Sequence, residues 1–163
     1  MVQDKENVSI FVDVQNIYYT CQEAFKRNFD YNAFWSEVSQ SYNIIDAYAY
    51  AIQRNEIKQI QFQNILEAIG FQIKLKPFIK RKDGTAKGDW DVGITIDMLE
   101  AAESSDRLIL LSGDGDFTIL LDTIKIKFKK RVDVYGVSSL TSNSLINSAN
   151  LFRTIDDTLL LRL

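Results

Sequence analysis

Two short segments of the chain are almost continuously apolar, and three more are rich in β-branched and aromatic residues. The continuous segments, 8–12 and 107–111, have the pattern of parallel strands that are covered on both faces. Residues 44–52, 71–79 and 132–137 complete a set of five predicted strands. The chain therefore has the strand content of a small sheet.

Segments with helical periodicity separate these strands. The pattern predicts helices over residues 16–28, 31–41, 56–69, 90–103, 117–128 and 143–150. Asp30 is placed to cap the second of them, and Gly70 to end the third. This alternation predicts an α/β fold, a doubly wound and mostly parallel sheet of five or six strands with helices on both faces. Without repeats or linkers, residues 1–163 are expected to form a single domain.

The tail and the overall apolar pattern bear on partners and location. Leu159, Leu160 and Leu161 either pack on the core or seat a second subunit in a homodimer. No apolar run approaches the roughly 18 residues that span a bilayer, and the charged start lacks a signal peptide. We expect a cytoplasmic protein without membrane contact.

Two features of the composition limit the chemistry. The chain has no histidine, which excludes Ser-His-Asp and Cys-His nucleophile pairs and histidine-ligated zinc. Its single cysteine, Cys21, forms neither an intrachain disulfide nor a zinc cluster. An enzyme built from this sequence must use carboxylates, lysines or a metal ion.

Aspartates follow two of the predicted strands directly. Asp13 ends the first strand, and Asp114 and Asp116 follow the fourth. If the strand order reverses between these two strands, as in 3-2-1-4-5, they are neighbours and their acids meet at the carboxyl edge of the sheet. That crevice is where such folds bind ligands.

A fourth acid, Asp91, opens the helix over 90–103 and leads its inward-facing stripe. A buried carboxylate without a partner is costly, so this position is unusual. Asp97 lies about 120° from that stripe and is expected at the border of the exposed side. Asp89 is better placed to cap the helix than to join a site.

Each acid has a local explanation as a helix cap, a turn former or a favourable charge at a helix start. Four carboxylates in one crevice, however, repel one another unless a cation lies among them. Oxygen ligands without histidine favour Mg²⁺ or Mn²⁺ over zinc.

On these residues, the sequence resembles the NYN domain of the PIN-like nuclease superfamily, in particular its LabA-like branch. The resemblance spans roughly residues 8–156 and rests on three motifs in order. They are Asp13-x-x-Asn16, Lys87-Gly88-x-x-Asp91-Val92 leading to Asp97-Met98-Leu99, and Ser112-Gly113-Asp114-Gly115-Asp116-Phe117. The last is the most specific.

The resemblance implies a PIN-like fold with strand order 3-2-1-4-5 and hydrolysis of RNA phosphodiester bonds in a pocket that binds Mg²⁺ or Mn²⁺. The implied catalytic and metal-binding residues are Asp13, Asp91, Asp114 and Asp116. Asn16 would orient Asp13, and Asp97 matches a recurrent acid of the family.

One departure from the family pattern concerns the C-terminal part. Asn150 stands where family members commonly have an aspartate, a change expected to remove one charge from the rim of the pocket.

The hypothesis is a metal-dependent ribonuclease in which Asp116 accepts the proton of the attacking water. Ser112 and Thr118 are expected to hydrogen-bond phosphate or the carboxylates. Four cations are expected to hold RNA, namely Lys80, Arg81, Lys82 and Lys87. Three aromatics near the crevice either pack or stack on bases, namely Tyr18, Tyr19 and Trp90.

The main alternative is a non-catalytic NYN module that binds RNA or a protein partner in regulation. It predicts folding and metal affinity without cleavage under any divalent ion. A haloacid-dehalogenase-like phosphatase is disfavoured, because that class needs an aspartate at the position of Gln15.

Overall fold

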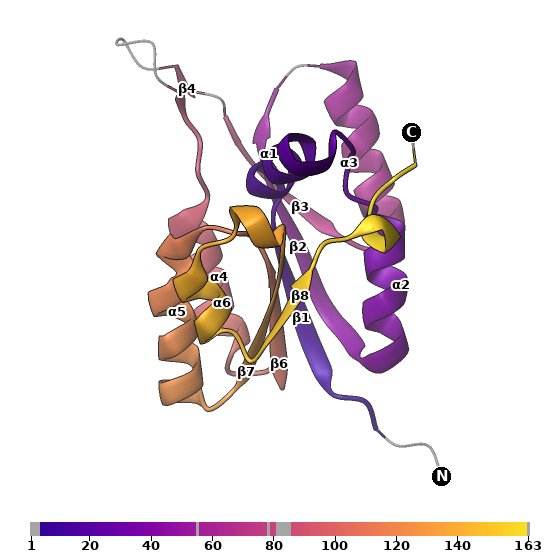
Figure 1. Cartoon of the computed structure of the whole chain (residues 1–163). Coiled ribbons are helices and arrows are strands. Elements are labelled where there is room, and N and C mark those ends of the chain that lie inside the picture. The colour runs from indigo at the N-terminus through magenta and orange to yellow at the C-terminus, as the bar shows by residue number, and fades with distance from the viewer. Residues whose placement is uncertain (1–3, 55, 78, 81–85, 163) are drawn as a thin grey trace.

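Six parallel strands form one sheet in the computed structural model (Figure 1). The structure describes residues 4–54, 56–77, 79–80 and 86–162. In spatial order the strands are β3 (Gln72–Pro77), β2 (Asn43–Gln53), β1 (Asn7–Asp13), β6 (Arg107–Leu111), β7 (Arg131–Gly136) and β8 (Leu151–Thr154). A separate antiparallel pair joins β4 (Ile79–Lys80) to β5 (Ala86–Lys87).

Helices connect the parallel strands and cover both faces of the sheet (Figure 1). The α-helices are α1 (Val14–Phe25), α2 (Tyr31–Ser41), α3 (Ile57–Ile69), α4 (Asp91–Ala101), α5 (Thr118–Thr123) and α6 (Asn143–Ser148). The helix predicted over 117–128 is composite: a 3₁₀ turn, Gly115–Phe117, precedes α5, and a π-helical stretch, Ile124–Phe128, follows it.

Alternation along β1 divides the interior into two cores. Val8, Ile10 and Val12 pack with residues of α1, α2 and α3. Phe11, which points the opposite way, packs with residues of α4, α5 and α6. Because successive side chains of a strand alternate between faces, the apolar run of β1 supplies both cores.

The predicted fold class and the order of the five predicted strands are confirmed. The sixth strand, β8, is only four residues long and lies at the edge of the sheet, with partly exposed side chains. Such a short segment has too little periodicity to be recognised. The strand predicted over 71–79 ends earlier, at Pro77, since proline has no amide hydrogen with which to extend the ladder.

The C-terminal tail packs on the core. Leu159 and Leu160 are buried, and the amide of Asp30 donates a hydrogen bond to the Leu159 carbonyl at 2.8 Å. Core packing is therefore confirmed for these two leucines. Leu161 is 47% exposed, and the homodimer stays a prediction.

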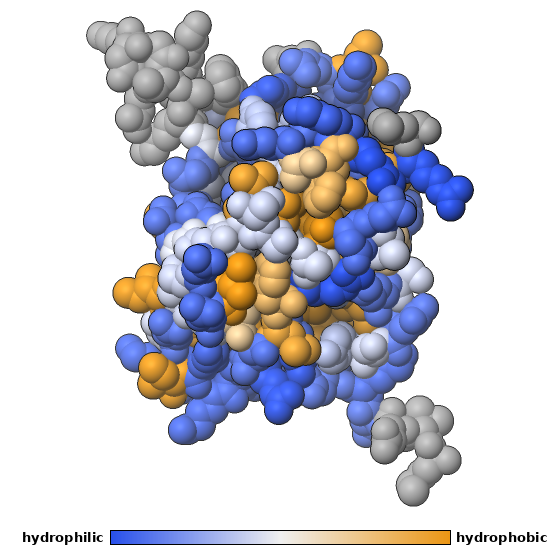
Figure 2. Space-filling view, in the orientation of Figure 1, coloured by the Kyte–Doolittle hydropathy of each residue, from blue (hydrophilic) through white to orange (hydrophobic). Residues whose placement is uncertain are grey.

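The face of the molecule that Figures 1 and 2 present is mostly hydrophilic. Hydrophobic side chains gather on it over β8, and further ones lie over α5 (Figure 2). Leu151 of β8 and Ile119 of α5 are among the exposed apolar residues. Within the described residues, none of the helices has the length and apolar character needed to cross a membrane.

Candidate metal centre

The ends of β1 and β6 bring the first two motifs together. These strands are neighbours, with Val12 of β1 opposite Leu111 of β6. Asp13 and Ser112 follow directly, and the Ser112 hydroxyl donates a hydrogen bond to the Asp13 carboxylate at 3.1 Å. The expected meeting of these strand ends at the carboxyl edge of the sheet is therefore observed.

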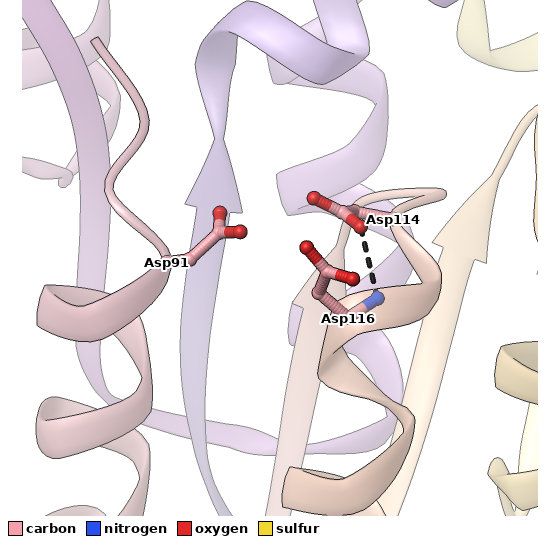
Figure 3. A group of neighbouring side chains, drawn as sticks. All are labelled: Asp91, Asp114 and Asp116. Atoms are coloured by element: carbon pink, nitrogen blue, oxygen red, sulfur yellow. Dashed lines mark hydrogen bonds between the residues drawn. The ribbon is translucent and has the colours of Figure 1, made fainter. Parts of the chain in front are cut away.

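Three aspartates converge next to this point (Figure 3). Asp91 reaches in from the first turn of α4, while Asp114 and Asp116 come from the turn after β6. One carboxylate oxygen from each lies within 4.8 Å of the others. Within the described residues, Asp13 stands beside this group rather than in it, held by its bond to Ser112.

Hydrogen bonds fix the shape of the turn that carries Asp114. Its amide donates to the Ser112 hydroxyl at 3.2 Å, and its own carboxylate accepts from the amide of Asp116 at 2.9 Å. The side-chain carbonyl of Asn16 accepts from the amide of Gly113 at 2.8 Å. Asn16 thus ties the start of α1 to this turn, and its backbone amide donates to the Asp13 carboxylate at 3.4 Å.

Close packing requires a glycine at position 113. A Cβ atom there would lie 2.7 Å from the carbonyl oxygen of Leu140, a distance that real contacts do not reach. The turn can therefore approach the neighbouring loop only without a side chain, and this approach sets where Asp114 points.

The electrostatics of the cluster favour a bound cation. Burial raises the pKa of Asp91 to about 7, and the charges of Asp114, Asp89, Asp13 and Asp116 add to the rise. Four surrounding carboxylates thus oppose ionisation of the one that opens α4.

Asp13 experiences a similar but partly relieved environment. Burial raises its pKa to about 6, whereas the hydrogen bonds from Asn16 and Ser112 oppose the rise, and the charges of Asp114 and Asp89 add to it. A divalent cation among these oxygens would remove the repulsion, so the donor set fits Mg²⁺ or Mn²⁺.

Asp97 lies apart from the three converging aspartates and has its own partners. It accepts a hydrogen bond from the Tyr50 hydroxyl at 2.7 Å and forms an ion pair with Lys74 at 2.6 Å. It is half-buried, as expected for a residue at the border of the exposed side, and both partners lie on the sheet. Asp97 links α4 to β2 and β3.

The other predicted residues take different places. Asp89 accepts a hydrogen bond from the amide of Asp91 at 3.1 Å, as a capping residue does. The Thr118 hydroxyl pairs with that of Ser144 at 2.9 Å, and no bond from Thr118 to an aspartate is found within the described residues.

The side chains of the four predicted RNA-binding cations lie outside what the structure describes. Arg81 and Lys82 lie outside the described residues, and only the backbones of Lys80 and Lys87 are described, in the β4–β5 pair.

Tyr50 and Lys76 contact the neighbourhood of the site but are not among the predicted site residues. Tyr50 lies opposite Asp13 in the β1–β2 pairing, a register that no local pattern in the sequence indicates. The Lys76 ammonium lies 4.4 Å from the ring centre of Trp90 and donates to the Asp89 carbonyl at 3.1 Å. Trp90 also donates to the Ala51 carbonyl at 2.9 Å, so it packs against the sheet.

The chain matches a known protein family over most of its length. The family model of the NYN domain matches residues 7–156, nearly the whole chain. The chain belongs to the NYN domain family. The resemblance inferred from the three motifs is thereby confirmed. Four of the motif acids, Asp13, Asp91, Asp114 and Asp116, lie at the carboxyl edge of the sheet.

Two individual proteins are similar to this chain over most of its length. The low amplitude and bright protein LabA of Synechococcus elongatus is 25% identical over 161 residues, covering 92% of this chain and 84% of that protein. A crystal structure of a Vibrio parahaemolyticus protein of unknown function is 53% identical, with a TM-score of 0.93 and 99% of both chains covered.

A more distant structure shares only the fold. A carbohydrate kinase from Agrobacterium tumefaciens matches with a TM-score of 0.50 and 11% identity, over 90% of this chain and 60% of that one. This likeness carries no conclusion about activity.

The expectation for Asn150 in this NYN domain is wrong. Its side-chain carbonyl accepts from the amide of Val132 at 2.8 Å, and its own amide donates to the Val132 carbonyl. Val132 lies at the amino end of β7, across the sheet from the acids. The residue at position 150 therefore removes no charge from the pocket.

Proposed function

We propose that this NYN domain is a Mg²⁺- or Mn²⁺-dependent ribonuclease that hydrolyses RNA phosphodiester bonds at its aspartate cluster. The observation that carries the proposal is the approach of Asp91, Asp114 and Asp116 oxygens to within 4.8 Å of one another. Membership of the NYN family supports nucleic acid as the class of partner.

The proposal assigns four residues to the cation. Asp91, Asp114 and Asp116 would hold it, with Asp13 beside them at the end of β1. Carboxylate oxygens are the ligands that Mg²⁺ and Mn²⁺ prefer. A divalent cation bound by these residues would supply positive charge against the scissile phosphate and would acidify the attacking water.

The chain's own groups divide the remaining work. Asp116 is the exposed member of the cluster, so it is the carboxylate best placed to accept the proton of the attacking water. Ser112 and Asn16 keep Asp13 and the Asp114 turn in place. Water attacks phosphorus and gives a proton to Asp116, while a P–O bond of the backbone breaks. One fragment keeps the phosphate, and the leaving oxygen takes up a proton from solvent and becomes a hydroxyl.

The test is incubation of the purified chain with mixed RNA and Mn²⁺ or Mg²⁺. Wild type is compared with Asp114→Asn and with Asp122→Asn, a matched charge removal on α5 outside the cluster. We expect cleavage by wild type and Asp122→Asn, and a loss of at least a hundredfold in Asp114→Asn.

Two other outcomes are informative. Equal cleavage by all three proteins would indicate a contaminating nuclease. RNA binding that requires a divalent ion, without cleavage under either one, would identify the non-catalytic NYN module instead.

A further inference from the structure

Helix α1, which begins directly after Asp13, exposes two adjacent aromatic rings. Tyr18 and Tyr19 are each 52% exposed, and their ring centres lie 5.5 Å apart at 71°. The helix starts at Val14, directly after Asp13, so the backbone of Tyr18 lies roughly 7.5 Å of helical rise beyond that of Asp13. Large exposed aromatics so near a phosphate-handling site call for an explanation.

The two rings share a face of α1 with a residue that borders the site. Gln15, Tyr18 and Tyr19 have i, i+3, i+4 spacing, and the buried residues Ile17 and Cys21 lie on the opposite side. This face therefore points away from the core along its whole first two turns.

Gln15 shows which way that face is turned. Its side-chain oxygen lies 3.9 Å from where a Cβ atom of Gly88 would stand. Gly88 belongs to the segment that leads into Asp91 and α4. The face thus begins beside the strand-to-helix segment of the site and continues outward through the tyrosines, and Figure 1 shows α1 lying across this edge of the sheet.

The chemistry of the face suits nucleobases. A tyrosine ring offers a flat π surface for stacking, while its hydroxyl stays hydrated when the site is empty. Among the described aromatics close to the acids, Phe117 and Tyr50 are buried. Trp90 bonds to the Ala51 carbonyl and is covered by Lys76. Within the described residues, the aromatics left free to stack on bases at this edge of the sheet are therefore Tyr18 and Tyr19.

We infer that Tyr18 and Tyr19 stack on unpaired bases next to the phosphate held at the acid cluster, so that the partner is single-stranded RNA. The inference rests on the ribonuclease function proposed above and adds the two side chains that hold the bases. In a duplex the bases are already stacked on each other, and their faces cannot reach the tyrosines.

The test measures binding of a fluorescently labelled single-stranded RNA by anisotropy in Ca²⁺, with gel analysis showing that the probe stays intact. A duplex of the same sequence serves as second ligand. The variants are Tyr18→Ala/Tyr19→Ala, Tyr18→Phe/Tyr19→Phe, and Phe25→Ala as a control at the far end of α1.

We expect the alanine pair to lose about tenfold or more in affinity for single-stranded RNA. The phenylalanine pair, which keeps both rings, and Phe25→Ala should stay within about threefold of wild type. Wild type should bind the duplex at least tenfold more weakly. Thermal unfolding of the alanine pair should match wild type closely, because both rings are exposed.

The outcomes separate this inference from the function on which it rests. Metal-dependent cleavage that Asp114→Asn abolishes, with unchanged affinity in the alanine pair or equal binding of duplex, would overturn the stacking role alone. If this face of α1 binds a protein partner instead, the RNA affinity of the Tyr18→Ala/Tyr19→Ala variant should equal that of wild type. A wild type that neither binds nor cleaves RNA would overturn both.

Discussion

The hydroxyl of Ser112 joins Asp13 to the turn that carries Asp114. It donates to the Asp13 carboxylate at 3.1 Å and accepts from the Asp114 amide at 3.2 Å, and the side chain is fully buried. One oxygen atom thus orients an acid on β1 and the backbone of the acid after β6.

Replacing Ser112 with alanine should therefore weaken the site without unfolding the protein. Asp13 loses a hydrogen bond that lowers its pKa, so that pKa should rise above about 6. Loss of an orienting partner typically lowers metal affinity or activity by about 10- to 100-fold. Mn²⁺ titration calorimetry and the RNA cleavage assay measure both effects. Ser104→Ala, at an exposed position after α4, is the control, and equal losses in both variants would contradict the assigned role.

The carboxyl-edge acids could be predicted from the sequence because parallel strands end at a common edge. Asp13 and Asp114 follow continuous apolar runs, so their strands and the ends of those strands were readable from local pattern alone. Asp91 required only the start of a helix.

Contacts that depend on the twist of the sheet and on loop paths could not be read in this way. Tyr50 and Asp97 are 47 residues apart, and nothing local indicates that their side chains meet. The family pattern placed Asn150 at the rim of the pocket. In the structure it lies at the amino end of β7, because β8 begins directly after it. Position along the chain did not fix the edge of the sheet.

Asp97 should act on stability rather than on metal binding. Asp97→Ala leaves the buried Tyr50 hydroxyl and the Lys74 ammonium without this partner, a loss of about 1–3 kcal/mol in the free energy of unfolding. Asp97→Asn, which can still accept from Tyr50, should lose less. Urea unfolding measures the change. If Asp97→Asn abolished Mn²⁺ binding at unchanged stability, Asp97 would instead be a ligand.

The buried ion pair of Arg107 and Asp133 supports the fold far from the acids. Asp133 accepts two hydrogen bonds of 2.8 Å from Arg107, near the amino ends of β6 and β7. Asp133→Ala should destabilise the protein by about 3–5 kcal/mol, because it leaves a buried guanidinium poorly paired. The double variant Arg107→Met/Asp133→Leu should recover much of this loss. Mn²⁺ affinity of the folded protein should stay unchanged in both, and a large drop would contradict the separation of the two regions.

The acid cluster should make the metal-free protein less stable as the pH rises. The pKa of Asp91 is about 7 in the folded protein, against an ordinary value of 3.8, so between these values the folded chain binds more protons than the unfolded chain. The free energy of unfolding therefore falls as the pH rises through this window. Thermal unfolding in EDTA should show a lower melting temperature at pH 8 than at pH 5.5, and Asp91→Asn should reduce the difference. Mn²⁺ should raise the melting temperature more at pH 8 than at pH 5.5, because deprotonated carboxylates bind it better. The contrary result would be the same change in melting temperature between pH 5.5 and pH 8 in EDTA for wild type and for Asp91→Asn. It would show that the carboxylates do not repel one another, and the metal site would lose its electrostatic basis.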